Sequence, residues 1–302
     1  MELKHLQALL GIADTGSFSA AAATIGTVQS NVSAHVARLE RELDVQLVDR
    51  ASGRLTEEGE VVVERARRVI YELEAMVSDV TALRKEVVGT VRLGMIGTTG
   101  RWLVPQLFDL LRVRHPHIHL NVADGASVPL EQQLASGQLD LAVVTFPLSG
   151  DEVLAAHLFD EDLVLLVPRN HPLAAQASLP LDALADLELL LPAPGTALRA
   201  EIDSAVVPAR VELRPAMELD GVRLIASLAF DGYGLAILPA TAVPGHLRDS
   251  FAVLNIEGLP RRRVGVAQRR RGLLSAPARA VIDVLDVVVH DALSMPEGIH
   301  PA

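Results

Sequence analysis

The 302-residue sequence contains no cysteine. Disulfide bonds, thiolate metal sites and thiol-based redox sensing are therefore excluded, because each of them requires a cysteine sulfur. Lysine is almost as scarce, with only Lys4 and Lys85, so arginine supplies nearly all the positive charge. No apolar run approaches the roughly 20 residues that a membrane-spanning helix needs, and the chain begins with an amphipathic segment rather than a targeting signal. We expect a cytoplasmic protein without a membrane partner.

Half of the residues are apolar, which is enough for two or three domains with cores of their own. The net charge is −11, and residues 1–60 contain nine acidic residues against five basic ones. This balance argues against a general nucleic-acid binder, since nonspecific affinity comes mainly from neutralising phosphates. If this part of the chain binds DNA, its arginines must lie together on one face.

Residues 17–43 predict two short helices that meet at a tight turn, which Gly26-Thr27 forms. Apolar residues then recur at intervals of three and four and predict the buried face of the second helix. These residues are Val28, Val32, Val36, Leu39 and Leu43. The opposite face is small and hydrogen-bonding, as a recognition helix in the DNA major groove requires. An ordinary amphipathic helical hairpin is the alternative.

The segment from Val45 to Thr56 predicts a β-hairpin, or wing, with a glycine between two arginines at its tip. Arginines in that position can reach the DNA backbone or minor groove. A solvated turn is the alternative. Recognition helix and wing together give the predicted DNA contacts, which are Gln29, Ser30, Asn31, Ser33, Arg38, Arg50 and Arg54.

Residues 57–88 predict one long helix whose apolar residues alternate in steps of four and three, a heptad seam. The seam residues are Val62, Ala66, Val69, Leu73, Met76, Val80, Leu83 and Val87. A seam of this kind needs a partner, so we expect a homodimer that presents two recognition helices to two DNA half-sites. Packing of the seam against the chain's own C-terminal part is the alternative.

Beyond Gly89, strands and helices alternate in the manner of a parallel α/β unit covered on both faces. The elements predicted for it are strands at 90–96, 119–123 and 139–145 and helices at 102–114 and 129–136. A second unit is predicted from a strand at 163–167, helices near 197–206 and 222–229, and strands near 235–238 and 251–256. Residues 264–268 and a helix from Ala276 to Ala292 could return to the first unit. Two α/β lobes with a cleft between them are therefore expected.

Ligands of open α/β sheets bind beyond the carboxyl ends of strands, near helix N-termini. This rule selects the loop from Gly97 to Arg101 and several later strand ends. The predicted effector contacts are Thr98, Thr99, Arg101, Ser127, Thr145, Phe146 and Thr196. The alternative for Thr98, Ser127 and Thr196 is a helix N-cap role, which is compatible with ligand contact. Asp220 is interpreted as a cap.

Other residue patterns predict no chemistry. His115, His117 and His119 alternate at a strand entry and are interpreted as surface residues rather than metal ligands. The arginine runs 261–263 and 269–271 predict a solvated face or a subunit contact. The sequence has no nucleophile elbow, P-loop, HExxH motif or dinucleotide fingerprint. We expect no catalytic residue, no cofactor and no metal.

A set of residues in the first 60 positions resembles the signature of the bacterial LysR-type transcriptional regulators. The set comprises Leu6 to Leu10, Gly16-Ser17-Phe18-Ser19, Ala21-Ala22, Gln29, Val32-Ser33, Leu39-Glu40, Leu43, Leu47, Arg50, Leu55-Thr56 and Gly59. Two departures are Ala34 and Ala37, where the family often has polar or basic residues, and Val48, which replaces an aromatic residue.

The resemblance implies a winged helix-turn-helix domain at residues 1–60 and a linker helix at 61–88 that mediates dimerisation. It also implies an effector domain at 89–302 like the two-lobed periplasmic binding proteins. Lobe I is expected at 89–163 with 268–302, and lobe II at 164–267. A dimer or dimer of dimers would bind an interrupted palindromic operator in double-stranded DNA and respond to a small, often anionic, effector. Peroxide sensing by a cysteine pair, known in one branch of this family, is excluded here.

Two other functions are compatible with this architecture. One is a cytoplasmic solute-binding module without DNA-binding activity, whose N-terminal helices serve only for assembly. The other is an enzyme built on the two-lobed fold, which would have to show turnover, because a fold alone does not establish a function.

Overall fold

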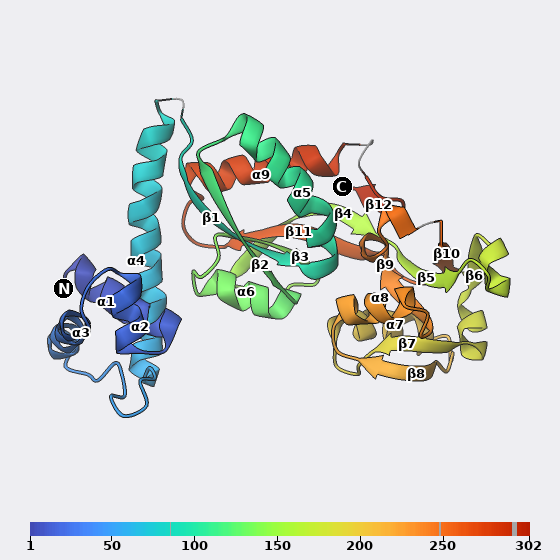
Figure 1. Ribbon diagram of the computed structural model, residues 1–302, viewed down its shortest axis with the longest axis horizontal. Helices are drawn as coiled ribbons and strands as arrows, with labels where there is room; N and C mark the ends of the chain where they lie inside the picture. Colours follow the sequence, from blue (N-terminus) through green and yellow to red (C-terminus); the bar gives the residue numbers. More distant parts are fainter. Residues whose placement is uncertain (85, 248, 292–294) are drawn as a thin grey trace.

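The computed structural model describes residues 1–84, 86–247, 249–291 and 295–302. Figure 1 shows three parts: a small helical domain, the long helix α4 (Glu57–Ala82), which stands across the long axis with the helical domain against one half of it, and an α/β part whose two lobes extend along that axis. In the described part of the chain, no helix is long and apolar enough to span a membrane. Lys85 in the expected linker helix and Ala292, the expected end of the last helix, lie outside the described residues.

The N-terminal domain packs three helices around one small core. These are α1 (Leu3–Thr15), α2 (Phe18–Thr24) and α3 (Gln29–Leu43). Val32, Val36 and Leu39 of α3 are fully buried, as the apolar spacing predicts. Val28 is 59% exposed, so its predicted burial is wrong. The reason is that Val28 is the N-cap and stands outside the helix.

The wing follows α3 as a very short hairpin. Val48 and Leu55 form an isolated antiparallel bridge, and the amide of Asp49 donates to the carbonyl of Arg54 at 2.8 Å. Gly53 has a φ of 73°, a conformation that favours glycine at the turn. The glycine between the two arginines is therefore explained by the backbone of the turn.

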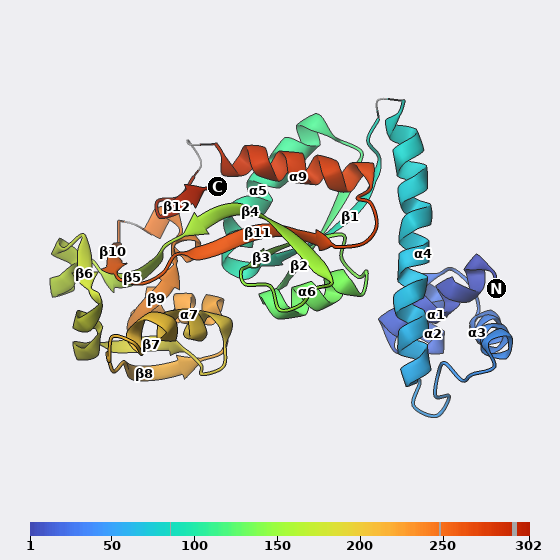
Figure 2. The ribbon, with the colours of Figure 1, turned by 180° about the vertical axis from the view of Figure 1, so that it is seen from behind.

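Helix α4 begins after Thr56, whose hydroxyl accepts the amide of Gly59 at 3.0 Å. Its 26 residues give a length of about 39 Å. It ends at Ala82 rather than at 88, so the predicted helix is too long at its C-terminal end. One end packs on the helical domain and the other lies beside lobe I, which Figure 2 shows from behind.

Lobe I contains a six-stranded sheet in the order β12-β4-β11-β3-β1-β2. Its strands are β1 (Gly89–Ile96), β2 (Ile118–Gly125), β3 (Leu141–Thr145), β4 (Val153–Glu161), β11 (Arg262–Arg269) and β12 (Ile299–Pro301). The first three are parallel, as predicted, but β11 is antiparallel to β3 and β4, so the sheet is mixed. Helices α5 (Gly97–Arg114) and α9 (Ala276–Val289) cover one face, and α6 (Ser127–Ala135) covers the other (Figure 1).

Lobe II contains a second six-stranded sheet in the order β6-β10-β5-β9-β7-β8. Its strands are β5 (Leu163–Pro168), β6 (Ser178–Pro180), β7 (Glu188–Pro192), β8 (Arg214–Leu219), β9 (Leu235–Pro239) and β10 (Phe251–Glu257). Its helices are α7 (Ala197–Val206) and α8 (Val222–Phe230), with 3₁₀ turns at Pro172–Ala175, Leu181–Asp186, Ala240–Ala242 and Gly245–Leu247. Strands β4, β6, β7, β8 and β12 were not predicted. The strands that are short or mostly exposed, such as β8, lack the apolar run that marks β5.

The chain crosses between the lobes twice, at the junction of β4 with β5 and in the segment before β11. Strand β11 pairs with β3 and β4, with Val264 opposite Thr145 and Arg262 opposite Glu161. The predicted lobe boundary at 267/268 is therefore wrong, and residues 262–267 belong to lobe I. Ladder hydrogen bonds to distant strands fix this assignment, and they leave no mark in the local sequence.

Candidate ligand cavity and nucleic-acid interface

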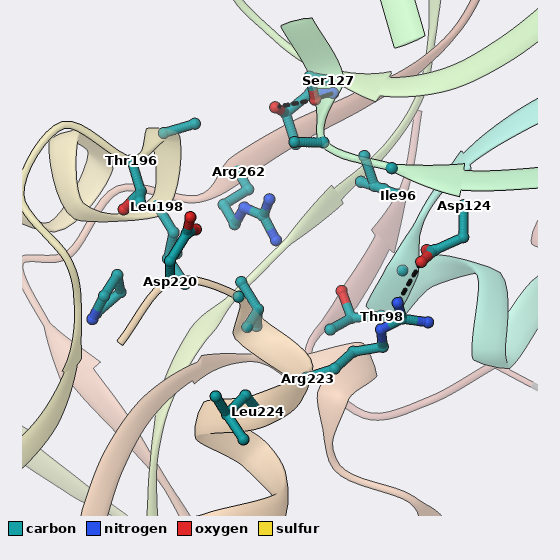
Figure 3. Close-up of a pocket in the computed structure, with 18 residues that line it drawn as sticks. Ile96, Thr98, Asp124, Ser127, Thr196, Leu198, Asp220, Arg223, Leu224 and Arg262 are labelled. Atoms are coloured by element: carbon teal, nitrogen blue, oxygen red, sulfur yellow. Dashed lines mark hydrogen bonds and ion pairs between the residues drawn. The ribbon is translucent and has the colours of Figure 1, made fainter. Parts of the chain in front are cut away.

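A cavity of about 430 Å³ lies between the two lobes, within the range of small-molecule sites. Figure 3 shows that its lining comes from both lobes. Four helices begin at this cavity, and their first turns contribute Thr98 of α5, Ser127 of α6, Ala197 of α7 and Val222 of α8. The two lobes thus direct four helix N-termini at one space.

Three of these helices have an N-cap residue without a hydrogen-bonding side chain. The caps are Ile96 for α5, Ala126 for α6 and Gly221 for α8. Only α7 is capped, by Thr196, whose hydroxyl accepts the amide of Arg199 at 3.3 Å. First-turn amides without a side-chain cap and the positive end of the helix dipole both favour an anionic or hydrogen-bond-accepting group.

Four of the seven predicted effector contacts line the cavity: Thr98, Ser127, Thr145 and Thr196. The hydroxyls of Ser127 and Thr145 lie 2.9 Å apart, and Ser127 Oγ also accepts the amide of Thr145 at 3.0 Å. The N-cap interpretation is confirmed for Thr196 alone. Thr98 and Ser127 lie inside the first turns of their helices, after the cap.

The other three predicted contacts lie outside the cavity lining. Thr99 is fully buried, and Arg101 is exposed on α5. The ring of Phe146 instead packs under the guanidinium of Arg263, at 5.0 Å. The predicted loop is in fact the first turn of α5, where successive residues point about 100° apart, so only part of it can face the ligand.

Arg262 is the most buried charged residue of the lining, with 8% of its side chain exposed. Its Nη1 lies 3.2 Å from Glu161 Oε2, and its Nε lies 2.8 Å from Glu201 Oε2. The predicted solvated face is therefore wrong for this arginine. Side chains alternate along β11, so the central arginine of the run faces inward. The pattern of three arginines would have indicated this only if β11 had been recognised as a buried strand.

Two carboxylates share this single guanidinium. Glu161 is fully buried, and its Oε1 accepts the amide of Thr241 at 2.8 Å. Burial raises the pKa of Glu201, and the nearby Arg262 opposes that rise. Because Glu161 and Arg262 come from lobe I and Glu201 from α7, the three charges join the lobes at the base of the cavity.

Asp124 and Asp220 also line the cavity and were not among the predicted contacts. Asp124 at the end of β2 forms an ion pair with Arg223 of α8, across the gap between the lobes (Figure 3). Asp220 was interpreted as a cap, but the cap of α8 is Gly221, with a φ of 107°. No described residue forms an ion pair or hydrogen bond with the Asp220 carboxylate. The strand-end rule selects this position, so the error lies in the role given to Asp220 rather than in its place.

The recognition helix presents most of its predicted contacts to solvent. Gln29, Ser30 and Asn31 in the first turn of α3 are exposed, as is Arg38 further along, and Ser33 is half-buried. None of them belongs to the core of the helical domain. The N-terminal end of α3 is therefore open to a partner along its polar face.

The two wing arginines differ in their surroundings. Arg54 is exposed, whereas Arg50 lies against α3. Nη2 of Arg50 is 3.0 Å from Glu40 Oε2, and Nη1 donates to the hydroxyl of Ser33 at 3.3 Å. The structure thus brings Arg50 to the recognition helix rather than to the tip of the hairpin.

The heptad seam of α4 divides into two parts. Val62 is half-buried and Ala66 buried, both in the core of the helical domain. Five later seam residues are exposed: Val69 (46%), Leu73 (37%), Met76 (55%), Val80 (55%) and Leu83 (85%). A different face of α4 contacts lobe I, where the hydroxyl of Tyr71 accepts the amide of Ser275 at 3.1 Å. The described C-terminal residues therefore leave the seam from Val69 to Leu83 uncovered, while Val87 is half-buried.

Lobe I is also tied to α4 through the N-terminus of α9. The carboxylate of Asp79 accepts the amide of Ala276 at 2.7 Å and lies 3.2 Å from Arg279. Helix α9 packs against α5, which begins at the cavity. Cavity, lobe I and long helix thus form a continuous chain of packed elements.

The sequence matches two protein-family models. Residues 3–60 match the model described as "Bacterial regulatory helix-turn-helix protein, lysR family", and residues 84–288 match "LysR substrate binding domain". The "probable hydrogen peroxide-inducible genes activator" of Streptomyces viridosporus is 32% identical over 273 residues, 88% of this chain and 88% of that protein.

Two solved structures have the same overall fold. A full-length OxyR from Pseudomonas aeruginosa, with a cysteine-to-aspartate substitution, is 27% identical with a TM-score of 0.79, and the match covers 99% of this chain and 97% of that one. Full-length CbnR in complex with its target DNA is 21% identical with a TM-score of 0.67, over 96% and 99% of the two chains.

Proposed function

The chain belongs to the LysR family of bacterial transcription regulators, and on this premise we propose that a ligand between its two lobes controls how a dimer binds DNA. Members of this family have a DNA-binding domain and an effector-binding domain, which are the two domains matched here. One observation carries the specific proposal. The same protomer has an exposed recognition helix and an exposed heptad seam on α4, and α4 packs against the lobe that lines the cavity. We propose residues 1–60, 61–88 and 89–302 as the three functional parts, with the lobe boundary moved to 261/262.

The first turn of α3 is proposed to read bases in the major groove. Gln29, Ser30, Asn31 and Ser33 carry the hydroxyl and amide groups that donate to and accept from base edges. The proposed phosphate contacts are Arg38, Arg50 and Arg54. Arg50 has a positioning role as well, because its bonds to Glu40 and Ser33 join the wing to the recognition helix.

The uncovered part of the α4 seam is proposed to pair with the same segment of a second copy. Two-fold pairing would place two recognition helices against the two halves of an interrupted palindrome. Pairing would also present two sets of Arg38, Arg50 and Arg54 to one DNA molecule, which doubles the number of proposed phosphate contacts. A dimer of dimers is compatible with the same seam.

The effector is proposed to bind in the cavity between the lobes, with an anionic group near the uncapped helix N-termini. Thr98, Ser127, Thr145 and Thr196 are the hydroxyls proposed to contact it. The peroxide response in the name of the Streptomyces relative does not transfer through a thiol, because this chain has no cysteine to oxidise.

The relatives are transcription regulators, and we propose that this chain likewise has no catalytic activity and acts in the cytoplasm, where its operator DNA is. The competing function is a solute-binding module without DNA-binding activity. The two differ in one property, which is specific affinity for a DNA sequence.

The test is to incubate the purified protein with fragments of genomic DNA at physiological salt and to sequence what it retains. We expect enrichment of a dyad-symmetric site, and loss of that enrichment in the Arg38→Ala, Arg54→Ala double variant while the dimer persists. Arg214→Ala, which removes an exposed arginine on β8 of lobe II, is the matched control and should bind as the wild type does. Absence of any enriched sequence, with or without cell metabolites, would leave the solute-binding module as the better account.

A further inference from the structure

We infer that the effector is a small zwitterion of the amino-acid type, whose carboxylate lies at the uncapped helix N-termini and whose protonated amine lies at Asp220. The inference rests on the effector role proposed for the cavity and goes beyond it by naming the ligand's chemical class. It follows from which charged groups of the cavity lining already form ion pairs within the protein and which do not.

The positive end of the cavity is formed by backbone amides at helix N-termini rather than by charged side chains. The first turns of α5, α6 and α8 meet the cavity without a side-chain cap, beside the paired hydroxyls of Ser127 and Thr145. Each helix N-terminus carries roughly half a positive charge. A ligand carboxylate placed there gains amide and hydroxyl donors without displacing an existing ion pair.

The side-chain cations are already committed to other carboxylates. Arg262 faces both Glu161 and Glu201, so this group of three carries a net negative charge when all are ionised. Arg223 is paired with Asp124. A ligand anion would have to compete with two carboxylates for the buried Arg262, and with Asp124 for Arg223, whose side chain is 68% exposed.

Asp220 is an exposed carboxylate of the lining, and the described residues provide no ion-pair or hydrogen-bond partner for it. It lies at the end of β8, one residue before the cap of α8, and Figure 3 shows its carboxylate directed into the cavity between Thr196 and Arg262. A purely anionic ligand in the same cavity would be repelled by this carboxylate. A protonated amine would supply up to three donors and a matching charge.

The rest of the lining is apolar and comes from both lobes. Ile96 belongs to lobe I, and Leu198 and Leu224 belong to α7 and α8 of lobe II. These side chains provide a surface for an apolar ligand side chain, while both charged groups of the ligand have partners elsewhere. The combination of an acid group, an amine and a small apolar part is that of an α-amino acid.

The first experiment measures the melting temperature of the full-length protein with each of the twenty proteinogenic L-amino acids. Every amino acid that raises the melting temperature is then compared with the 2-oxo acid of the same side chain, which keeps the carboxylate and lacks the amine. We expect at least one amino acid to stabilise the protein and its 2-oxo acid to bind about tenfold more weakly or worse. Stabilisation by 2-oxo acids as strong as that by amino acids overturns the inference, and so does the absence of a shift with all twenty.

The second experiment assigns the amine to its partner. Asp220→Asn should weaken binding of the stabilising amino acid about tenfold or more, measured by calorimetry, and change binding of the 2-oxo acid much less. Asp231→Asn, at the other end of α8 and exposed, is the matched control and should bind like the wild type. Equal loss for both ligands in Asp220→Asn would show that Asp220 acts on cavity shape rather than on the amine.

Failure of this inference is distinguishable from failure of the proposed function. Retention of a dyad-symmetric DNA fragment without any response to amino acids would leave the regulator intact and remove only the zwitterion. Binding of an amino acid by a protein without specific DNA affinity would support the zwitterion and remove the regulator function.

Discussion

Substitution of Met76 by glutamate tests whether the uncovered seam of α4 holds the dimer together. Met76 lies in the middle of the free part of the seam, between Leu73 and Val80, and 55% of its surface is exposed. Lobe I covers a different face of the helix, through Tyr71 and Ala75. The substitution therefore changes the seam without entering a core of the protomer.

The magnitude follows from the area that pairing would bury. Full burial of a methionine side chain stabilises by about 1.5–3 kcal/mol, and about half of that surface remains to be buried here. The gain is then about 1 kcal/mol in each protomer and about 2 kcal/mol in the symmetric dimer. Glutamate forfeits this gain and places two like charges in the seam. Since 1.4 kcal/mol is a tenfold change, the dimer Kd should rise about thirtyfold or more.

Sedimentation velocity over a concentration series measures this Kd directly. Met76→Leu keeps the seam apolar and should remain dimeric. Thr81→Glu adds the same charge to the same helix at a position outside the seam, and should also remain dimeric. A Met76→Glu protein that stays dimeric at concentrations where its thermal unfolding is normal would refute pairing through α4.

Three further predictions concern DNA affinity, packing and pH. Arg54→Ala should lower the slope of log affinity against log salt by about 1, measured by fluorescence anisotropy with an operator fragment, because one phosphate contact is lost. Gly59→Ala should lower the free energy of unfolding by about 3 kcal/mol in urea titrations, since its Cβ would lie 2.1 Å from the carbonyl of Leu47, whereas Gly150→Ala meets nothing within 4 Å and should be neutral. Burial raises the folded-state pKa of Glu201 above its ordinary value of 4.5, so the folded state binds the proton more tightly and loses stability as pH rises from about 4.5 through the folded pKa. Glu201→Gln should remove this part of the pH dependence. If the difference in free energy of unfolding between wild type and variant stays constant across that pH range, burial does not raise the pKa of Glu201.

The DNA-binding domain could be predicted closely because its signals are local. The turn at Gly26 and the spacing of Val32, Val36 and Leu39 involve residues within two helical turns of one another. The error at Val28 is also local, since the pattern does not show where a helix begins. Whether Arg50 points to DNA or to Glu40 could not be predicted, because that contact joins positions ten residues apart.

The cavity was predicted only in part because the strand-end rule needs the strands. It found Thr145, at the end of a strand with a strong apolar run, and Ser127, at the start of the helix that follows β2. It also selected Asp220, but the position directly before a helix was interpreted as a cap rather than as a ligand contact, whereas the cap is Gly221. It included Arg101, because a helix that starts directly after β1 was taken for a loop.

The sequence by itself determined the order of the parts, the helical periodicities, the absence of thiol chemistry and the resemblance to a regulator family. These properties depend on which residues are present and on spacings of a few positions, and a chain carries them before it folds. The tertiary structure alone decided which charges meet. Arg262 lies buried between Glu161 and Glu201 because β11 pairs with strands more than 100 residues earlier in the chain. Asp220 faces the cavity without a partner among the described residues because the ends of two different sheets meet there, and no local pattern encodes that meeting.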